Sequence, residues 1–289
     1  MTEHEQLMYQ VLEKISELNA TIVFKGALIT KLILAENGYT TLDRKTIDID
    51  ANWIGSPPSM NALVDSINRS LGDMQDRFYA VAIREYGEKK SAGISIRRKG
   101  TDEDVIEMDI SMKPVTGSRM YYHGETQIRG VLANEILADK ITVLSNRIMF
   151  RRAKDLVDVY ALTHCVSVVT AEIFEVITSK RLELGEFSEL LNHRNEVEHA
   201  YNKLRGIDGK PAFDHVYSYL KEFVQPFAKR DETPRRWNSS AFIWEDFCQT
   251  KEQEGKPSVT AAIRAAEKER HSKTPSEPKK AKHKNEAEL

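Results

Sequence analysis

The sequence predicts an α+β fold in which a mixed sheet with flanking helices is followed by a largely helical half. Up to about residue 125, short β-branched or alternating runs are mixed with helical periodicity, and helical periodicity alone continues from 131 to 227. The last residues have few apolar side chains. The predicted organisation is a core over 1–125, a helical domain over 126–250 that completes the cleft, and a mostly disordered tail over 251–289.

Composition narrows the class of protein. The chain has 289 residues, of which 40% are hydrophobic, enough for a buried core. Its 42 Lys and Arg against 44 Asp and Glu give a net charge of −2, so any contact with nucleic acid must be local. Cys165 and Cys248 fit neither a disulfide framework nor a zinc site. An acidic start and no apolar run near the ~20 residues of a membrane helix predict a soluble, cytoplasmic protein without a membrane partner.

The first elements are a helix, a strand and a second helix. Thr2 and Glu5 have the spacing of a capping box, and apolar residues then follow at helical spacing, which predicts a helix over 3–18. The β-branched run 21–24 predicts a buried strand. Gly26 follows at once, where the strand can turn directly into the next helix.

The next strand, over residues 46–51, carries two carboxylates. Alternation places its side chains on two faces, one with Ile47, Ile49 and Ala51, the other with Thr46, Asp48 and Asp50. The strand therefore presents Asp48 and Asp50 side by side.

A helix is predicted over 60–71 and further strands over 79–84, 94–98 and 105–110. The last strand carries Glu107 and Asp109 on one face. From there the pattern is helical, over 131–146, 152–165, 170–180, 187–205 and 214–227.

The carboxylates Asp48, Asp50 and Asp109 point to metal chemistry. Acids gathered on one side of a sheet repel one another, and Mg²⁺ relieves this because it binds a few carboxylates together with substrate phosphates. Two ions about 3.5–4 Å apart would clamp the attacking and leaving oxygens of a phosphoryl displacement. A helix N-terminus at Gly26 suits a triphosphate. Two alternatives stay open: Asp-x-Asp also fits the solvent face of an edge strand, and Glu107 could replace Asp109.

Lys140 lies among apolar neighbours at helical spacing, so its ammonium lies on or beside the buried stripe of its helix. It either reaches water past its neighbours or enters the cleft and meets phosphates.

The stretch 147–158 places basic residues before two acids. Arg147, Arg151 and Arg152 are the candidates for RNA contact, and the stretch equally fits a solvated helix start with Asp155 and Asp158 as surface charge. These two acids are three residues apart on one helix face, and Lys154 or Lys140 would relieve their repulsion.

Five motifs together resemble the AbiEii-type nucleotidyltransferases, a branch of the DNA-polymerase-beta-like superfamily that includes toxins of toxin–antitoxin and phage-defence systems, the MenT enzymes among them. The resemblance spans about residues 20–165. The motifs are Phe24-Lys25-Gly26-Ala27, Arg44-x-Thr46-x-Asp48-Ile49-Asp50, Glu107-Met108-Asp109, Asn134-Glu135-Ile136-Leu137-Ala138-Asp139-Lys140 and Arg152-Ala153-Lys154-Asp155-Leu156-Val157-Asp158.

The resemblance implies a polymerase-beta-like core and roles for particular residues. Asp48 and Asp50 would bind metal, Asp109 would be the third metal-binding carboxylate and help deprotonate the attacking hydroxyl, Lys140 would hold the triphosphate, and Asp155 would orient Lys140 or the nucleotide. The nucleotide-binding set is Lys25, Gly26, Ala27, Arg44, Thr46, Lys140 and Lys154. Ala27 departs from the family, which usually has Gly or Ser there, so we expect altered rather than absent nucleotide binding.

The implied reaction is the transfer of a nucleoside monophosphate from an NTP to a hydroxyl with two Mg²⁺ ions, by a toxin that blocks translation. The resemblance points to the 3′ end of tRNA as acceptor and to a cognate antitoxin as a partner. Alternatives are nucleotidylation of a protein or of a small molecule such as an aminoglycoside, and a non-catalytic binding module.

Overall fold

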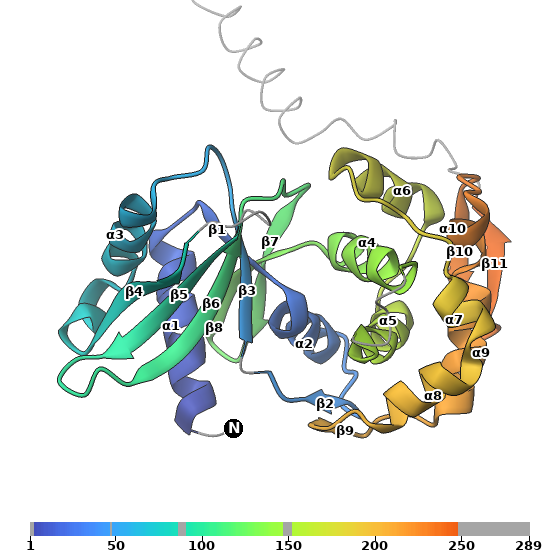
Figure 1. Cartoon of the computed structure of the whole chain (residues 1–289), viewed down its shortest axis with the longest axis horizontal. Coiled ribbons are helices and arrows are strands. Elements are labelled where there is room, and N and C mark those ends of the chain that lie inside the picture. Colours follow the sequence, from blue (N-terminus) through green and yellow to red (C-terminus); the bar gives the residue numbers. More distant parts are fainter. Residues whose placement is uncertain (1–2, 47, 86–90, 147–151, 248–289) are drawn as a thin grey trace, which may run out of the picture. The chain divides into compact units, whose positions relative to one another are not determined.

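The computed structural model describes residues 3–46, 48–85, 91–146 and 152–247 (Figure 1). Residues 1–247 form one compact unit with a continuous hydrophobic core. The predicted tail, 251–289, lies outside the described residues. In the described part, no helix is both long and apolar enough to cross a bilayer.

The N-terminal elements follow the sequence prediction closely. The predicted helix over 3–18 is α1 (Glu3–Leu18), and the strand and the helix after it are β1 (Ile22–Lys25) and α2 (Gly26–Glu36). The strand with the two aspartates is β3 (Asp48–Trp53), after a short β2 (Asp43–Arg44).

The next elements also match the prediction to within a few residues. They are α3 (Met60–Ser70), a 3-10 turn η1 (Gly72–Asp76), β4 (Phe78–Arg84), β5 (Ser91–Arg98) and β6 (Asp104–Ser111). The Ser59 hydroxyl caps α3 by accepting a hydrogen bond from the Ala62 amide.

Two strands that the sequence pattern does not indicate follow, β7 (Ser118–His123) and β8 (Thr126–Val131). They complete a seven-stranded mixed sheet of order β4-β5-β6-β3-β1-β8-β7. The predicted core boundary at residue 125 thus falls inside the β7–β8 hairpin. The division into a core and a helical domain stays a prediction.

The second half is helical, with two small strand pairs. Its elements are α4 (Ala133–Leu144), α5 (Lys154–Cys165), α6 (Thr170–Ser179), α7 (Ser188–Asn192), α8 (Arg194–Asn202), β9 (Ile207–Asp208), α9 (Phe213–Phe223), α10 (Gln225–Lys229), β10 (Arg235–Asn238) and β11 (Ile243–Asp246). The prediction of one continuous helix over 187–205 is wrong, because His193 has non-helical dihedral angles and divides the segment into α7 and α8.

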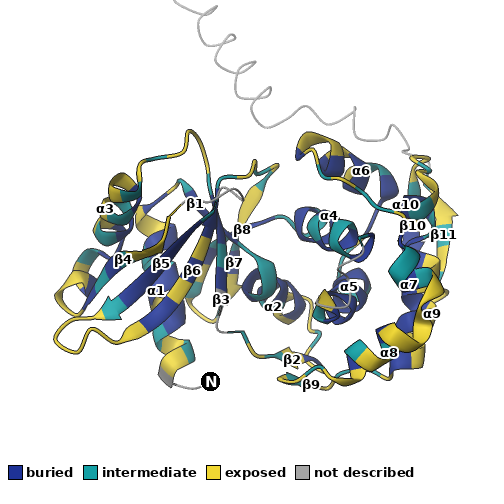
Figure 2. Ribbon diagram, viewed as in Figure 1, coloured by how far each residue is buried: buried dark blue, intermediate teal, exposed yellow. Residues whose placement is uncertain are grey.

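Helix α2 connects the sheet to the helical half. It packs against β1 and β3 on one side and against α4 and α5 on the other (Figure 1). Figure 2 shows α5 as one of the most buried helices, and every residue from 155 to 163 in it is buried. A helix buried all round must satisfy its charged side chains internally, and this requirement shapes the site below.

Candidate active site

Gly26 and Asp50 form the centre of the site. Strands β1 and β3 are antiparallel, and their register places Lys25 opposite Asp50. Gly26 begins α2 with φ +68°, a conformation that side chains disfavour. A Cβ atom at Gly26 would clash with the Asp50 Oδ2 atom. Only glycine therefore lets this carboxylate lie directly against the start of the helix.

The substitution Gly26→Ala is expected to disturb both stability and activity. The backbone penalty of a left-handed alanine is about 1 kcal/mol, and the added methyl group must also displace the Asp50 carboxylate. Gly38→Ala is the matched control, because Gly38 lies just after the same helix with φ +71° and a Cβ atom there would have no neighbour within 4 Å. We expect both variants to lose stability in urea titrations and only Gly26→Ala to lose the nucleotidyl transfer that the sequence resemblance implies. Equal activities would contradict the placement of Asp50.

Asp109 lies beside Asp50 on the neighbouring strand. Strand β6 runs parallel to β3, and the register pairs Asp50 with Asp109. Burial raises the pKa of Asp50, and the Asp109 charge raises it further, while Lys25 opposes the shift. A buried carboxylate next to a second one gains from a divalent cation, and carboxylate oxygens are the ligands that Mg²⁺ prefers. Asp50 and Asp109 therefore fit a magnesium ion.

Asp48 and Glu107 form the adjacent pair in the same ladder. The backbone of Asp48 is in β3, as predicted, but its side chain lies outside the described part of the structure. Glu107 and Asp109 are both exposed on the same face of β6, so Glu107 remains an alternative ligand. Among the side chains that the structure describes, no three His, Cys, Asp or Glu gather closely enough to hold a metal. The three-aspartate site stays a prediction.

A pocket of about 280 Å³ opens over these carboxylates. Acidic and basic side chains from both halves of the chain line it, with a few apolar ones beneath. The lining residues are Ile49, Asp50, Ile83, Arg84, Gly93, Glu107, Met108, Asp109, Arg152 and Lys154. A polyanion with bound cations, such as a nucleoside triphosphate, suits such a lining.

Arg84 is a site residue that the sequence analysis missed. Its Nη2 atom lies 3.0 Å from the Asp109 Oδ1 atom, and both side chains are about half exposed. A register shift near the end of β4 and the absence of a side chain at Gly93 bring Arg84 over β5. The sequence signal is an arginine at the end of a β-rich run, which is too common to be informative.

Lys140 on α4 is buried and held by two carboxylates of α5. Its Nζ atom donates hydrogen bonds to Asp155 Oδ1 at 2.6 Å and to Asp158 Oδ2 at 2.7 Å. Burial alone would lower the pKa of Lys140, but the two aspartates outweigh it and the pKa is raised. The prediction that Lys140 lies on the buried stripe is confirmed, and the alternative that it reaches past its neighbours to water is wrong.

Two arginines extend this network at its ends. Arg44 pairs with Asp158, and the Arg152 Nε atom donates to Asp155 Oδ2 at 3.0 Å. Asp155 and Asp158 are fully buried, so their interpretation as ordinary surface charge is wrong. Burial raises the pKa of Asp155, but Lys140 and then Arg152 lower it more, and the net pKa is lowered. A chain of alternating charges thus runs from Arg44 to the pocket.

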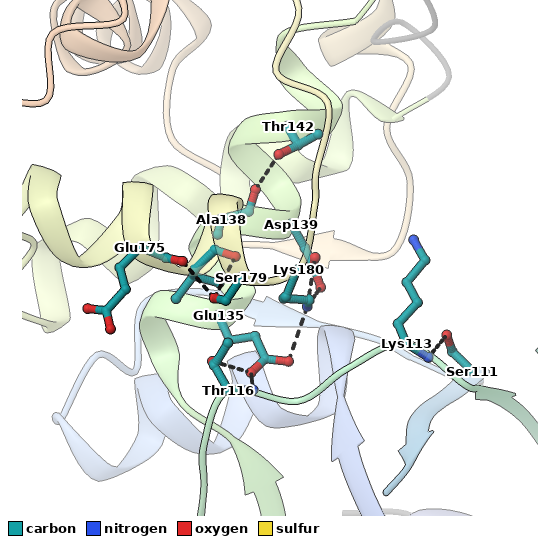
Figure 3. A network of polar contacts seen from close by, with 11 residues as sticks. Ser111, Lys113, Thr116, Glu135, Ala138, Asp139, Thr142, Glu175, Ser179 and Lys180 are labelled. Atoms are coloured by element: carbon teal, nitrogen blue, oxygen red, sulfur yellow. Dashed lines mark hydrogen bonds and ion pairs between the residues drawn. The ribbon is translucent and has the colours of Figure 1, made fainter. Parts of the chain in front are cut away.

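A second buried network ties α4 to the sheet (Figure 3). The Lys180 Nζ atom lies 3.1 Å from Glu135 Oε1 and 2.9 Å from both carboxylate oxygens of Asp139. The Glu135 Oε2 atom accepts hydrogen bonds from the amide and the hydroxyl of Thr116, in the segment after β6. This network fixes the start of α4, and therefore Lys140, relative to the strand that carries Asp109.

The remaining predicted nucleotide-binding residues lie around this centre. Lys25 is half-buried at the end of β1, and burial lowers its pKa, with Lys180 and Lys113 contributing, against the opposing charges of Asp139 and Asp50. Three further members are half-buried: Ala27 in α2, Thr46 in the segment between β2 and β3, and Lys154 at the start of α5.

Of the predicted RNA-binding arginines, only Arg152 can be placed. It lines the pocket, and its side chain is 49% exposed. Arg147 and Arg151 lie outside the described residues.

Comparisons with known proteins give a family. The model described as "Nucleotidyl transferase AbiEii toxin, Type IV TA system" matches residues 7–239. No curated protein sequence matches the chain. One similar structure is MenT4, a nucleotidyltransferase toxin from Mycobacterium tuberculosis, with 13% identity, a TM-score of 0.48, and coverage of 78% of this chain and 82% of that one. Another is an antigenic nucleotidyltransferase-like protein from Paracoccidioides brasiliensis, with 14% identity, a TM-score of 0.40, and coverage of 69% and 92%.

Proposed function

Because the chain belongs to the AbiEii nucleotidyltransferase toxin family, we propose that it transfers a nucleoside monophosphate from an NTP to the 3′ hydroxyl of a tRNA in the presence of Mg²⁺. Such a modification would block translation, which suits a toxin that is restrained by a cognate antitoxin and released in phage defence.

One observation carries this proposal: the Asp50 carboxylate lies against Gly26, at the start of α2, and opposite Asp109. A helix start with free amide groups suits phosphate, and paired carboxylates suit the cations that accompany a triphosphate. The adjacent pocket also contains Arg152 and Lys154, which can neutralise further phosphate charge. This grouping of acidic and basic side chains supports a phosphoryl-transfer reaction.

The acidic residues and Lys140 would have separate roles in the reaction. Asp48, Asp50 and Asp109 would hold Mg²⁺, which when bound neutralises phosphate charge and favours the alkoxide form of the acceptor. The acceptor oxygen forms a bond to the α-phosphorus, the bond to pyrophosphate breaks, and Asp109 receives the proton of the hydroxyl. Lys140 has one N–H left after binding its two aspartates, which it can donate to a phosphate oxygen.

The experiment that tests this proposal follows the α-phosphate. Purified protein is incubated with Mg²⁺, deproteinised total tRNA and each NTP in turn, labelled on either the α- or the γ-phosphate. We expect label from the α-position in RNA and label from the γ-position in pyrophosphate. tRNA oxidised with periodate, which destroys the 3′-terminal diol, is the matched control and should remain unlabelled.

The other outcomes distinguish the rival functions. Label on added protein or on an aminoglycoside, with none on tRNA, would replace the acceptor but keep the chemistry. If no acceptor is labelled and folded Asp50→Asn protein remains as toxic as the wild type, the chain acts as a non-catalytic binding module and the proposal fails.

A further inference from the structure

A short ribbon joins the catalytic strand to the helical half. Strand β2 pairs with β9 in antiparallel register, Asp43 with Asp208 and Arg44 with Ile207. The pairing continues by one bond, because the Lys45 amide donates to the Gly206 carbonyl at 3.0 Å. The opposite turn is closely packed, since a Cβ atom at Gly209 would clash with the Thr41 carbonyl oxygen. The ribbon therefore presents its side chains from a fixed backbone.

Charge is divided between the two ends of this ribbon. The pair Asp43 and Asp208 lies at one end, and Asp43 is bound to Lys31. Lys45 and Arg205 lie at the other end, both exposed. Lys210 follows β9 at the Asp208 end, but its ammonium donates to the carbonyl oxygen of Tyr201, four residues before Arg205. In the described part of the chain, none of these three cations has an ion pair with a carboxylate. Like charges collected in this way gain from a bound polyanion.

The basic end is also the end closest to the site. Lys45 precedes Asp48 by three residues, so their Cα atoms are separated by at most about 11 Å. Because Gly206 is bonded to Lys45, Arg205 lies next to the same approach. The protein as a whole carries a net charge of −2. Attraction for a nucleic acid must therefore come from a local cluster of this kind rather than from the overall field.

We propose that Lys45, Arg205 and Lys210 form a surface that binds the phosphate backbone of the acceptor RNA on its way to Asp50. This inference rests on the proposed function for the identity of the acceptor, but the binding surface can be tested without catalysis. RNA is favoured over an acidic protein because the surface leads directly to the carboxylates that would act on a 3′ end.

The test compares two variants with the same loss of charge. Lys45→Gln with Arg205→Gln removes two cations of the surface and leaves Lys210, whose Nζ atom donates to the Tyr201 carbonyl oxygen. Arg69→Gln with Lys99→Gln is the control, because both residues are exposed, Arg69 on α3 and Lys99 in the turn after β5. Binding of fluorescent total tRNA is measured by anisotropy between about 50 and 300 mM salt, with Mg²⁺ and without NTP.

We expect the surface variant to bind tRNA about tenfold more weakly near 0.1 M salt. The slope of the logarithm of its binding constant against the logarithm of the salt concentration should become less steep by about 1.4, the value for two lost contacts to single-stranded phosphates. The control should match the wild type, and NTP-induced thermal stabilisation should be unchanged in both variants. Equal tRNA binding by the surface and control variants would overturn the inference. So would a surface variant that binds tRNA like the wild type but no longer binds a purified acidic antitoxin. If the wild type binds tRNA but labels none, only the proposed function fails.

Discussion

The variant Asp50→Asn is expected to lose nucleotidyl transfer by a factor on the order of a thousand or more while remaining folded. Removing one metal-binding carboxylate takes away several kcal/mol of stabilisation of transition-state charge. The amide has almost the same shape as the carboxylate, so it can still lie against Gly26. Asp65→Asn, at an exposed position in α3, is the control and should retain full activity.

The same variant has an expected effect on stability with a defined sign. The pKa of Asp50 is raised in the folded protein, so the ionised form destabilises the fold above the ordinary Asp pKa of about 3.9. With divalent cations chelated, Asp50→Asn should therefore be more stable than the wild type at pH 7. The difference should shrink as the pH falls through the raised pKa and vanish below the ordinary value.

Mg²⁺ should reverse this order. Denaturant titrations with and without Mg²⁺ measure the free energy of unfolding of both proteins. Mg²⁺ should raise this free energy for the wild type and leave it unchanged for Asp50→Asn. An active Asp50→Asn protein, or one that Mg²⁺ stabilises as much as the wild type, would contradict the assignment of this carboxylate.

Lys140→Met should produce the largest loss of stability among the site variants. The substitution keeps an unbranched apolar chain but leaves Asp155 and Asp158 as buried acids without their shared cation. Breaking a buried ion pair by removing one partner costs about 3–5 kcal/mol. We also expect activity to be lost, because the same nitrogen is the proposed phosphate donor. Urea midpoints and the labelled-NTP assay measure the two effects.

The reason for the loss can be separated from general damage to the protein. Lys14→Met removes a lysine that is paired only at the surface and should leave the urea midpoint unchanged. Adding Asp155→Asn to Lys140→Met should restore part of the lost stability without restoring activity. A single Lys140→Met variant as stable as the wild type would show that this network does not hold α4 to α5.

Strands β3 and β6 can be predicted from the alternation of apolar and acidic residues, and β1, β4 and β5 from short runs rich in β-branched and other apolar residues. Strands β7 and β8 escape that prediction, although the residues between them, Gly124 and Glu125, have the spacing of a two-residue hairpin turn. The break between α7 and α8 is invisible for a different reason. Leu190 and Val197 are both buried and seven residues apart, so the apolar periodicity of a helix continues through this segment, although the helical backbone is interrupted at His193.

The site can be predicted to the extent that its residues are close in sequence. The resemblance to the AbiEii-type motifs implies that Asp155 orients Lys140, and the structure shows the two in contact. The contact of Asp158 with Arg44 joins residues 114 positions apart, and the contacts of Lys180 with Glu135 and Asp139 depend on how α6 packs against α4. No periodicity in one chain reports such distances. From the sequence alone, Asp158 is therefore interpreted as a surface charge, because its tertiary partners are not visible there.

The charged path from Arg44 through Asp158 to Lys140 also bears on the biosynthesis of this protein. Its members come from β2, α4 and α5, so a nascent chain cannot assemble them before α5 has left the ribosome. Until then, Arg44 and Lys140 have no α5 carboxylate to bind. A prematurely terminated translation product that ends before α5 is therefore expected to be inactive. The cell that encodes this toxin would then not be harmed by incomplete chains.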